Sequence, residues 1–220
     1  LMTAIAAQAA IAIENSRLYI DSVHSLLALA RALEAKDAYT VGHSERVTRI
    51  AVAVGQELRL PPRELNLLRQ VCPLHDVGKV GVPERVLLKG AALTRAERKQ
   101  MMMHTTVGYK ILQPVRIFRE GLAIVRNHHE RMDGAGYPDG LSGEEIPVVA
   151  RITTVADAFD AMTSDRPYRD ALPLARAKDE IRRGSGRQFD ARIAKALLKL
   201  IRELDARVYD FPARRSAATP

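Results

Sequence analysis

The sequence predicts an all-α fold, and two observations carry that prediction. Nearly every segment shows apolar residues at helical spacing or a signal for the start of a helix. No segment shows sustained alternation of apolar and polar residues between turn signals, which is the pattern of a half-buried strand. With 220 residues, 47% hydrophobic and 27% charged, the chain fits one good-sized globular domain, or one domain with a fragment of another.

Each predicted helix has a local reason in the sequence. Residues 1–36 are rich in Ala, Ile and Leu and contain no breaker, so they predict one long helix. The prolines at 61–62 are typical of a helix start, and the pattern Thr-x-x-Glu from Thr94 is a capping box. Gly184 should end one helix, and Asp190 should cap the last. We therefore expect helices over about residues 1–36, 43–58, 63–74, 94–104, 118–130, 148–164, 173–183 and 190–206.

The composition limits the classes of partner and the cellular compartment. The net charge of +8 raises the odds of an anionic partner, but aromatic residues are too scarce to stack single-stranded bases, so we expect no nucleic acid. The sequence contains no apolar stretch long enough to span a bilayer and no export signal. The lone Cys72 excludes internal disulfides. These features predict a cytoplasmic protein.

Five of the six histidines fall on four separate predicted helices or at their ends. His24 lies on a plain helix surface, and the other five are His43, His75, His104, His128 and His129. An isolated His75-Asp76 pair would be an ordinary helix end, but five histidines with nearby acids indicate ligands that converge in a bundle. Asp157 adds a carboxylate in an otherwise apolar helix, where an isolated charge is costly.

Two neighbouring pairs, His75-Asp76 and His128-His129, indicate how many ions are bound. Consecutive helix residues point about 100° apart and do not normally serve one ion. Two ions about 3.5–4 Å apart, with one bridging carboxylate, accept both members of each pair. Nitrogen and oxygen ligands without thiolate favour iron, manganese, zinc or another first-row ion over structural zinc. The sequence therefore predicts a binuclear centre.

Five stretches together resemble the HD-GYP domains, a bacterial branch of the HD phosphohydrolases. They are "YTVGHSERV", "LHDVGK", "MMMHTTVGYKIL", "HHERMDGAGYPDGL" and "ARITTVADAFDAMTSDRPYR". The resemblance covers about residues 20–205, and the signature is Gly136-Tyr137-Pro138. It implies an HD-type helical bundle with an additional C-terminal helical extension. It also implies hydrolysis of cyclic di-GMP, a bacterial second messenger, to pGpG and in some members to GMP, by a hydroxide that bridges two metal ions.

The same resemblance implies roles for individual residues. The first metal would be held by His43, His75, Asp76 and Asp157, and the second by the shared Asp76 with His104, His128 and His129. Iron is the expected metal, with manganese or another first-row ion as the alternative. Lys79 would reach the scissile phosphate or the bridging hydroxide, although it also fits a solvated surface charge. The guanine and phosphate groups would be engaged by Asp160, Arg166 and Arg169, and Gly136-Tyr137-Pro138 would shape the rim of the site.

The domain organisation also follows from resemblance. Residues 1–20 look like a remnant of the last helix of a GAF sensory domain with a linker, so the chain should begin inside a larger protein. The phosphodiesterase domain would occupy residues 21–206, and residues 207–220 would form a flexible tail. The long first helix predicts a parallel homodimer, although a strict heptad is not evident. Tyr39 stands where some family members have a glutamate ligand for a third metal, so we expect two ions per chain.

Two other classes of function remain open. The chain could bind cyclic di-GMP, or a diguanylate cyclase partner, without turnover, but the complete ligand set favours an enzyme. It could also be another HD-type enzyme that acts on nucleotides or guanosine tetraphosphate, or a di-iron oxygenase. The extended "HHERMDGAGYPDG" loop argues against that class. We therefore expect a cyclic di-GMP phosphodiesterase.

Overall fold

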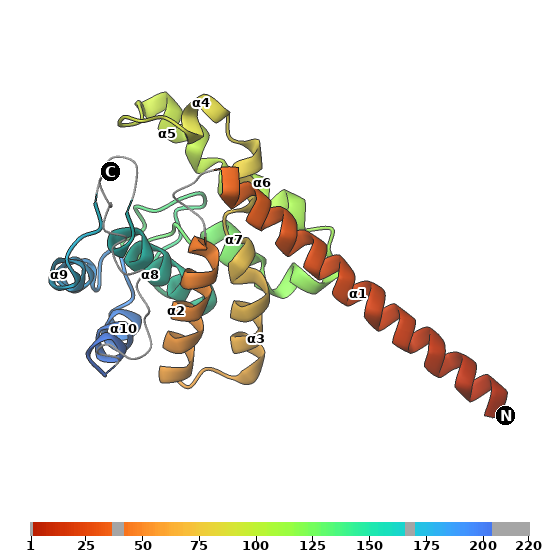
Figure 1. Cartoon of the computed structure of the whole chain (residues 1–220). Helices are drawn as coiled ribbons and strands as arrows, with labels where there is room; N and C mark the ends of the chain where they lie inside the picture. Colours follow the sequence, from red (N-terminus) through yellow and green to blue (C-terminus); the bar gives the residue numbers. More distant parts are fainter. Residues whose placement is uncertain (1, 37–41, 166–169, 204–220) are drawn as a thin grey trace, which may run out of the picture.

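The computed structural model describes residues 2–36, 42–165 and 170–203, and these residues fold into helices joined by loops (Figure 1). They contain no β-strand, apart from an isolated bridge between Ser185 and Phe189, which confirms the predicted all-α class. The α-helices are α1 (Met2–Lys36), α2 (His43–Glu57), α3 (Pro62–Val71), α4 (Glu84–Leu87), α5 (Arg95–Met102), α6 (His104–Leu112), α7 (Leu122–Asn127), α8 (Val148–Thr163), α9 (Leu174–Gly184) and α10 (Ala191–Glu203). The 3₁₀ helices are η1 (Cys72–Leu74), η2 (Val77–Gly81), η3 (Arg116–Gly121) and η4 (Gly143–Glu145).

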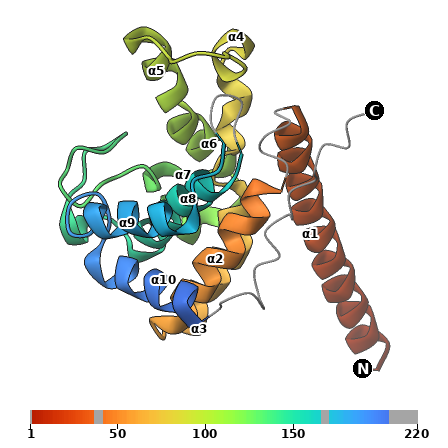
Figure 2. The ribbon, with the colours of Figure 1, turned by 60° about the vertical axis from the view of Figure 1, so that its left-hand side comes forward.

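The core forms where α2 and α8 pack against each other, with α3, α7 and α10 around them (Figure 2). Along α2, Val47, Ile50, Ala51 and Val54 follow the i, i+3, i+4, i+7 spacing, and all four are buried. Helix α8 is buried over most of its length, which explains its almost unbroken apolar run. The site residues on these two helices therefore stand on a closely packed pair.

Two segments extend from this core. Helix α1 projects away from it along its N-terminal half, where Ile5, Ile11, Ile13 and Leu18 are more than half exposed (Figure 1). Its C-terminal part packs on η1 and η2. Helices α4 and α5 pair with each other and connect to the core through α6. Among the described helices, none combines the length and the apolar character that crossing a membrane requires.

Three of the predicted helix starts are confirmed, two of them by capping hydrogen bonds. Thr94 Oγ1 accepts the Glu97 amide at 3.3 Å, and the Glu97 carboxylate accepts the Thr94 amide at 2.8 Å, which completes the capping box of α5. The Asp190 carboxylate accepts two backbone amides at the start of α10. Helix α3 begins at Pro62, as the proline pair predicts.

Two predicted helices are less regular than expected. The third was expected to reach Leu74, but α3 ends at Val71, because Pro73 has no N–H to donate and the chain tightens into η1. The helix expected from about residue 118 begins as η3, and the α-helix starts only at Leu122. Gly121 lies at that junction, where a Cβ atom would come within 2.5 Å of the Val71 side chain.

The helix that was expected to carry His104 is divided into α5 and α6 at Met103. At this junction, side chains donate hydrogen bonds to backbone carbonyl oxygens. His104 Nδ1 lies 2.7 Å from Met101 O, and Thr105 Oγ1 lies 3.1 Å from Met102 O. Such bonds compete with the regular helical ladder, so the division has a local cause. It makes His104 the first residue of α6.

Candidate metal centre

Three of the predicted ligands form a first group. His43 is the first residue of α2, His75 directly follows η1, and Asp157 lies on α8. Their ligand atoms all lie within 4.8 Å of one another, and both imidazoles are buried. The fold therefore brings together residues that are more than 100 positions apart in the sequence.

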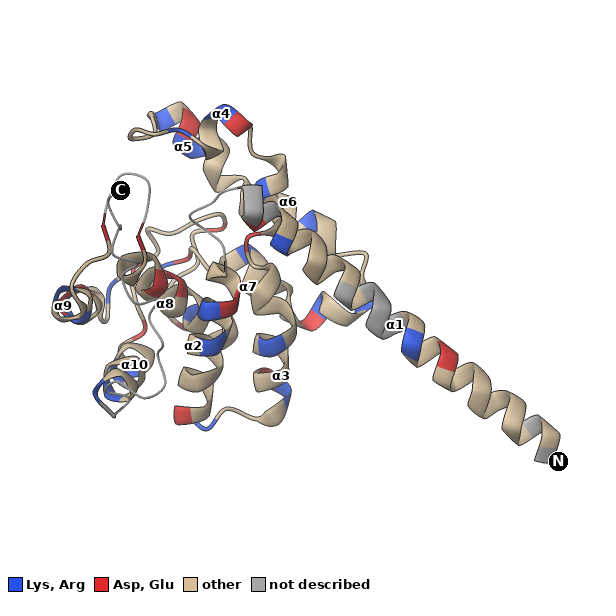
Figure 3. Cartoon of the chain, in the orientation of Figure 1, with Lys and Arg blue, Asp and Glu red and all other residues tan. Residues whose placement is uncertain are grey.

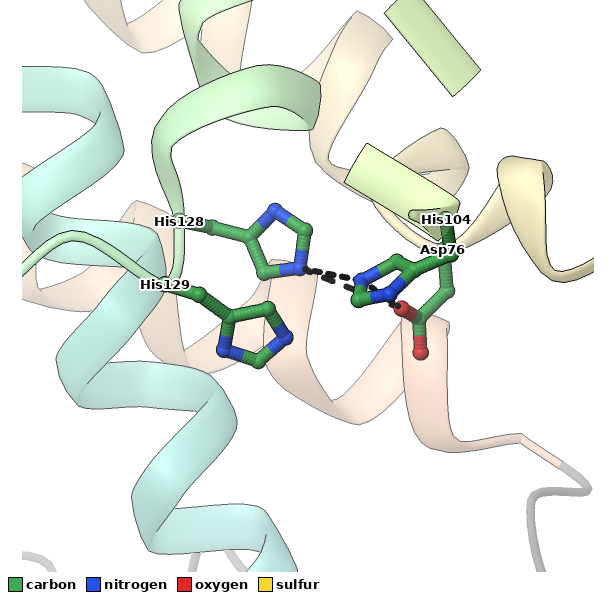
Figure 4. A group of neighbouring side chains, drawn as sticks. All are labelled: Asp76, His104, His128 and His129. Carbon is green, nitrogen blue, oxygen red and sulfur yellow. Dashed lines mark hydrogen bonds and ion pairs between the residues drawn. The ribbon is translucent and has the colours of Figure 1, made fainter. Parts of the chain in front are cut away.

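The other four predicted ligands form a second group (Figure 4). Asp76 lies between η1 and η2, His104 opens α6, and His128 and His129 follow α7. Their ligand atoms also lie within 4.8 Å of one another. The structure thus contains two groups of nitrogen and oxygen donors, an arrangement consistent with a binuclear centre.

The Asp76 carboxylate lies between the two groups. Its Oδ1 atom is 3.3 Å from His104 Nε2 and 3.9 Å from His128 Nε2. Its Oδ2 atom is 3.5 Å from His75 Nε2 and 4.0 Å from His43 Nε2. One oxygen faces each group, so this carboxylate would be placed to hold an ion on either side.

Backbone carbonyls close by in the chain orient three of the imidazoles. The Nδ1 atom faces the carbonyl oxygen three residues earlier at 2.9 Å in His75, 2.7 Å in His104 and 3.0 Å in His128. Because a carbonyl oxygen can only accept, each Nδ1 carries the proton. Each Nε2 therefore presents a lone pair to the cluster, as a metal ligand must.

These lone pairs are suited to cations. The Nε2 atoms of His104 and His128 are 3.4 Å apart although neither carries a proton, and His75 Nε2 is buried without a hydrogen-bond partner among the described residues. Burial lowers the pKa of His128 well below its ordinary value and that of His129 to about 4, so both are neutral near pH 7. Metal ions bound here would satisfy these nitrogens.

Lys79 contacts the Asp76 carboxylate, which lies between the two groups. Its Nζ atom is 2.5 Å from Asp76 Oδ2, and its side chain is 24% exposed. Burial by itself would raise the pKa of Asp76, but Lys79 and the nearby imidazoles hold that pKa well below its ordinary value. The site therefore combines an ionised carboxylate with an ammonium group that solvent can reach.

Close backbone packing holds this segment against the second group. A Cβ atom on Gly78 would overlap the carbonyl oxygen of His104 and the amide nitrogen of Gly108. Only glycine permits η2 to approach α6 so closely. Gly78 therefore serves the packing of η2 on α6.

The Nδ1 side of the His43 ring, which faces away from the ligand group, contacts Asp160, and Asp160 in turn contacts Arg46. His43 Nδ1 lies 2.7 Å from Asp160 Oδ2, and the Arg46 guanidinium donates to both oxygens of the same carboxylate. Burial opposes the imidazolium form, but bonds to Asp157 and Asp160 outweigh it and raise the pKa of His43 to about 9 in the metal-free chain. Sequence reasoning missed Arg46, although it lies one turn after His43. The predicted contact of Asp160 with a ligand stays a prediction.

The Gly136-Tyr137-Pro138 signature packs on His129. A Cβ atom on Gly136 would come within 2.5 Å of the Arg131 amide nitrogen, so a larger residue would not fit. The Tyr137 ring stacks on the His129 ring, with centroids 4.8 Å apart and planes at 26°. The Tyr137-Pro138 peptide bond is cis. The signature therefore borders the second group.

Glu130 supports the same loop and was not singled out in the sequence. Its side chain is buried, and Oε1 accepts the backbone amides of Asp139 at 2.7 Å and Gly140 at 3.2 Å. Asp139 also accepts two hydrogen bonds from the Arg126 guanidinium. The one sequence signal that points to Glu130 is its position directly after His128 and His129.

Three residues named in the sequence analysis lie outside the described residues. They are Tyr39, Arg166 and Arg169. The predicted contacts of the two arginines with guanine and phosphate, and the position of the Tyr39 phenol, stay predictions.

Comparisons with known proteins extend these observations. A family model described as an HD domain matches residues 28–193. The cyclic di-GMP phosphodiesterase response regulator RpfG of Xanthomonas campestris pv. campestris is 43% identical over 177 residues, which cover 80% of this chain and 47% of that protein. A 3'3'-cGAMP-specific phosphodiesterase of Vibrio cholerae is 38% identical over 150 residues, which cover 68% of this chain and 33% of that protein.

The fold is similar to that of a solved protein as well. Bd1817, an HDG"Y"P protein from Bdellovibrio bacteriovorus, matches with a TM-score of 0.61 at 20% identity, over 73% of this chain and 51% of that one. At this identity the likeness concerns the fold alone. The chain spans about half or less of the length of these relatives. The family match and the signature together show that the chain belongs to the HD-domain family and is of its HD-GYP type.

Proposed function

We propose that this chain is a metal-dependent phosphodiesterase that hydrolyses cyclic di-GMP to the linear dinucleotide pGpG, with GMP as a further product when the second phosphodiester is also cut. One observation carries the proposal. Two largely buried groups of histidine and aspartate lie beside each other, with the Asp76 carboxylate between them, and the Lys79 ammonium contacts that carboxylate. The substrate is supported by the relative from Xanthomonas, which bears this activity in its name.

Two divalent ions per chain would occupy the site, one at each ligand group. The first would be held by His43, His75 and Asp157, and the second by His104, His128 and His129, with Asp76 shared. We propose iron, with manganese or another first-row ion as the alternative, because imidazole and carboxylate ligands suit these metals. When bound, the ions would neutralise the phosphate oxygens and lower the pKa of a water molecule that attacks phosphorus.

The residues of the chain itself would bind and orient the phosphodiester. The exposed part of Lys79 allows its ammonium group to pair with a phosphate oxygen or with the departing ribose 3′-oxygen. The stacked Tyr137 ring would keep the His129 ring from turning. Arg166 and Arg169 would contact the guanine and phosphate groups of the nucleotide.

A second cyclic dinucleotide, 3'3'-cGAMP, is the other candidate substrate. It is favoured by the Vibrio cholerae relative, whose name states that specificity. The two nucleotides have the same phosphodiester linkage and differ in one purine base. The ligand groups act on the phosphate, so they do not discriminate between these substrates. Discrimination would fall to residues that contact the bases.

Metal analysis of anaerobically purified protein, with nucleotide turnover followed on the same sample, tests the proposal. We expect two iron ions per chain, pGpG as the first product, and faster turnover of cyclic di-GMP than of 3'3'-cGAMP or guanosine tetraphosphate. Asp76→Ala should remove turnover. Asp179→Ala is the matched control, because this exposed aspartate pairs only with Arg182 on α9 among the described contacts.

Other outcomes would identify the competing functions. Tight binding of cyclic di-GMP without turnover by the metal-loaded protein would identify a non-catalytic receptor. Preferred turnover of a nucleotide that is not a cyclic dinucleotide would identify another HD-type phosphohydrolase. Either result would overturn the proposed activity.

We also infer that two copies of the chain associate through α1. Residues 2–13 contain no charged side chain (Figure 3), and Ile11 and Ile13 are strongly exposed there. Pairing would cover this apolar surface. Light scattering should give twice the mass of one chain, and Ile11→Asp should reduce it to one. Binding to a diguanylate cyclase stays a prediction.

A further inference from the structure

The outer side of His43 is held by charged residues to which the proposed chemistry assigns no role at the metal. His43 Nδ1 donates to Asp160 Oδ2 at 2.7 Å, while its Nε2 lies 3.3 Å from Asp157 Oδ1 inside the first ligand group. Asp160 accepts two bonds from Arg46, from Nε to Oδ1 at 2.7 Å and from Nη2 to Oδ2 at 3.1 Å. Arg46 Nη2 also donates to Ser164 Oγ at 3.3 Å.

Helical spacing brings these residues together. On α2, His43 and Arg46 are three positions apart, and on α8, Asp157 and Asp160 are also three positions apart. Each helix therefore presents a ligand and, about one turn further on, a supporting residue on the same face. Because α2 and α8 pack directly against each other, the two ligands meet and so do the two supporting residues.

The surroundings of Asp160 favour support of His43 over contact with a nucleotide. Its side chain is only 4% exposed, and both oxygens are engaged by His43 and Arg46. An ionised carboxylate in such a place needs charged partners, and the guanidinium fork supplies them in a fixed plane. A nucleotide base in solvent would have little access to these oxygens.

We propose that Asp160 and Arg46 are positioning residues for His43, which rests on the metal centre proposed above. The carboxylate keeps the imidazole proton on Nδ1, so that Nε2 presents its lone pair to the first ion. The arginine fixes the plane of the carboxylate. A carboxylate on the outer nitrogen of a ligand histidine orients the ring and strengthens it as a donor, and loss of such support typically costs 10- to 100-fold in metal affinity.

Another buried arginine–aspartate pair, which joins α8 to the start of α10, provides the matched control. Arg151 Nη1 donates to Asp190 Oδ2 at 2.7 Å, and both residues are buried. This pair ties α8 to the start of α10, and neither residue belongs to a ligand group. Arg151→Met therefore removes the same kind of interaction from the same helix without touching His43.

Cobalt(II) titration of the metal-free protein, followed by visible absorption, tests the proposal. The wild type should bind two cobalt ions. In Arg46→Met and Asp160→Asn, one ion should bind about 10- to 100-fold more weakly with an altered spectrum, while the other binds as in the wild type. Arg151→Met should lose stability but keep both cobalt affinities. At saturating cobalt, all variants should bind cyclic di-GMP with wild-type affinity.

The outcomes separate the proposal from its alternatives. Unchanged cobalt binding in Arg46→Met and Asp160→Asn would overturn it. Normal cobalt binding with weakened nucleotide binding would also overturn it, because Asp160 would then contact the nucleotide. If Arg46→Met does not fold by circular dichroism, Arg46→Lys gives the same test, since lysine keeps the charge but lacks the fork, and its cobalt affinity should fall below that of the wild type. Failure of the wild type to bind cobalt would contradict the metal centre itself.

Discussion

Replacement of Gly78 by alanine should damage the site although it adds one methyl group and removes no ligand. Gly78 lies in η2, two residues after Asp76 and one before Lys79. The added Cβ atom would overlap the carbonyl oxygen of His104 and the amide nitrogen of Gly108, and it would lie 2.8 Å from the His104 carbonyl carbon. All of these are backbone atoms of α6, so no side chain can rotate to make room.

The magnitude follows from the atoms that the methyl group would meet. Overpacking of an interior typically costs about 1–3 kcal/mol, and immobile backbone neighbours place this substitution at about 3 kcal/mol of unfolding free energy. Relief requires η2 to move away from α6, which would separate Asp76 from His104. A displacement near 1 Å at a catalytic centre can cost about 100-fold in rate. Turnover should therefore fall by about that factor even where the protein is fully folded.

Urea unfolding, metal analysis and turnover of Gly78→Ala should be measured beside Gly81→Ala. Gly81 lies in the same 3₁₀ helix, but the three atoms nearest to its added Cβ belong to the Val107 side chain, the first at 3.0 Å. This control should lose less than about 1 kcal/mol and keep its metal. Wild-type stability, metal content and turnover in Gly78→Ala would show that the close packing of η2 on α6 does not hold the two ligand groups together.

The other predictions concern a ligand, the nucleotide, the number of ions and a proton. Asp76→Ala should abolish turnover and leave at most one ion per chain in metal analysis, because both ions lose a ligand. Arg166→Ala should weaken cyclic di-GMP binding in calorimetric titration by about 1.5–3 kcal/mol, the contribution of a hydrogen bond to a charged group, with metal content unchanged. Crystals of the wild type should show two anomalous peaks, and a third only after Tyr39→Glu, because a neutral phenol is a poor ligand. The metal-free protein should lose stability in urea unfolding as the pH rises from 6.5 to about 9. Burial lowers the pKa of His43, but Asp157 and Asp160 outweigh it and raise that pKa to about 9. In this range the folded state therefore holds a proton that the unfolded state releases.

Each of these predictions has a contrary result. Near wild-type activity and metal content in Asp76→Ala would exclude a shared carboxylate. Wild-type affinity in Arg166→Ala would remove this residue from the nucleotide site. Three well-occupied peaks with Tyr39 in place would contradict a two-ion centre. A rise in the stability of the metal-free protein over the same pH range would reverse the sign of the assigned pKa shift of His43.

The set of candidate ligands could be predicted from the sequence because its members are chemically conspicuous, whereas their division between two ions came from the resemblance to HD-GYP domains. Histidines and aspartates at the edges of apolar helices are costly without partners, so their number and order alone indicate a shared purpose. Helix starts such as Thr94 and Asp190 were equally accessible, because a cap depends on residues within four positions of it. In both cases the residue and its close neighbours in the sequence are enough for the prediction.

The supporting residues could not be predicted because their roles depend on distant contacts. Arg46 looks like a surface charge until the fold brings Asp160, 114 positions away, within 2.7 Å. The helical turns of η2 and α4 were not anticipated either, since they are too short for a periodic pattern. η2 depends on its packing against α6, which the sequence alone does not display.

The imidazoles of His75, His104 and His128 take their orientation from carbonyls three residues earlier, so each ligand segment is prepared by its own short stretch of chain. These segments are far apart in the sequence, and bound ions would hold them together. The free energy of metal binding would then contribute to the free energy of folding. A chain that lacks metal would open more often and be degraded sooner by cellular proteases. The abundance of the protein, and not only its activity, should therefore follow the supply of metal in the cell.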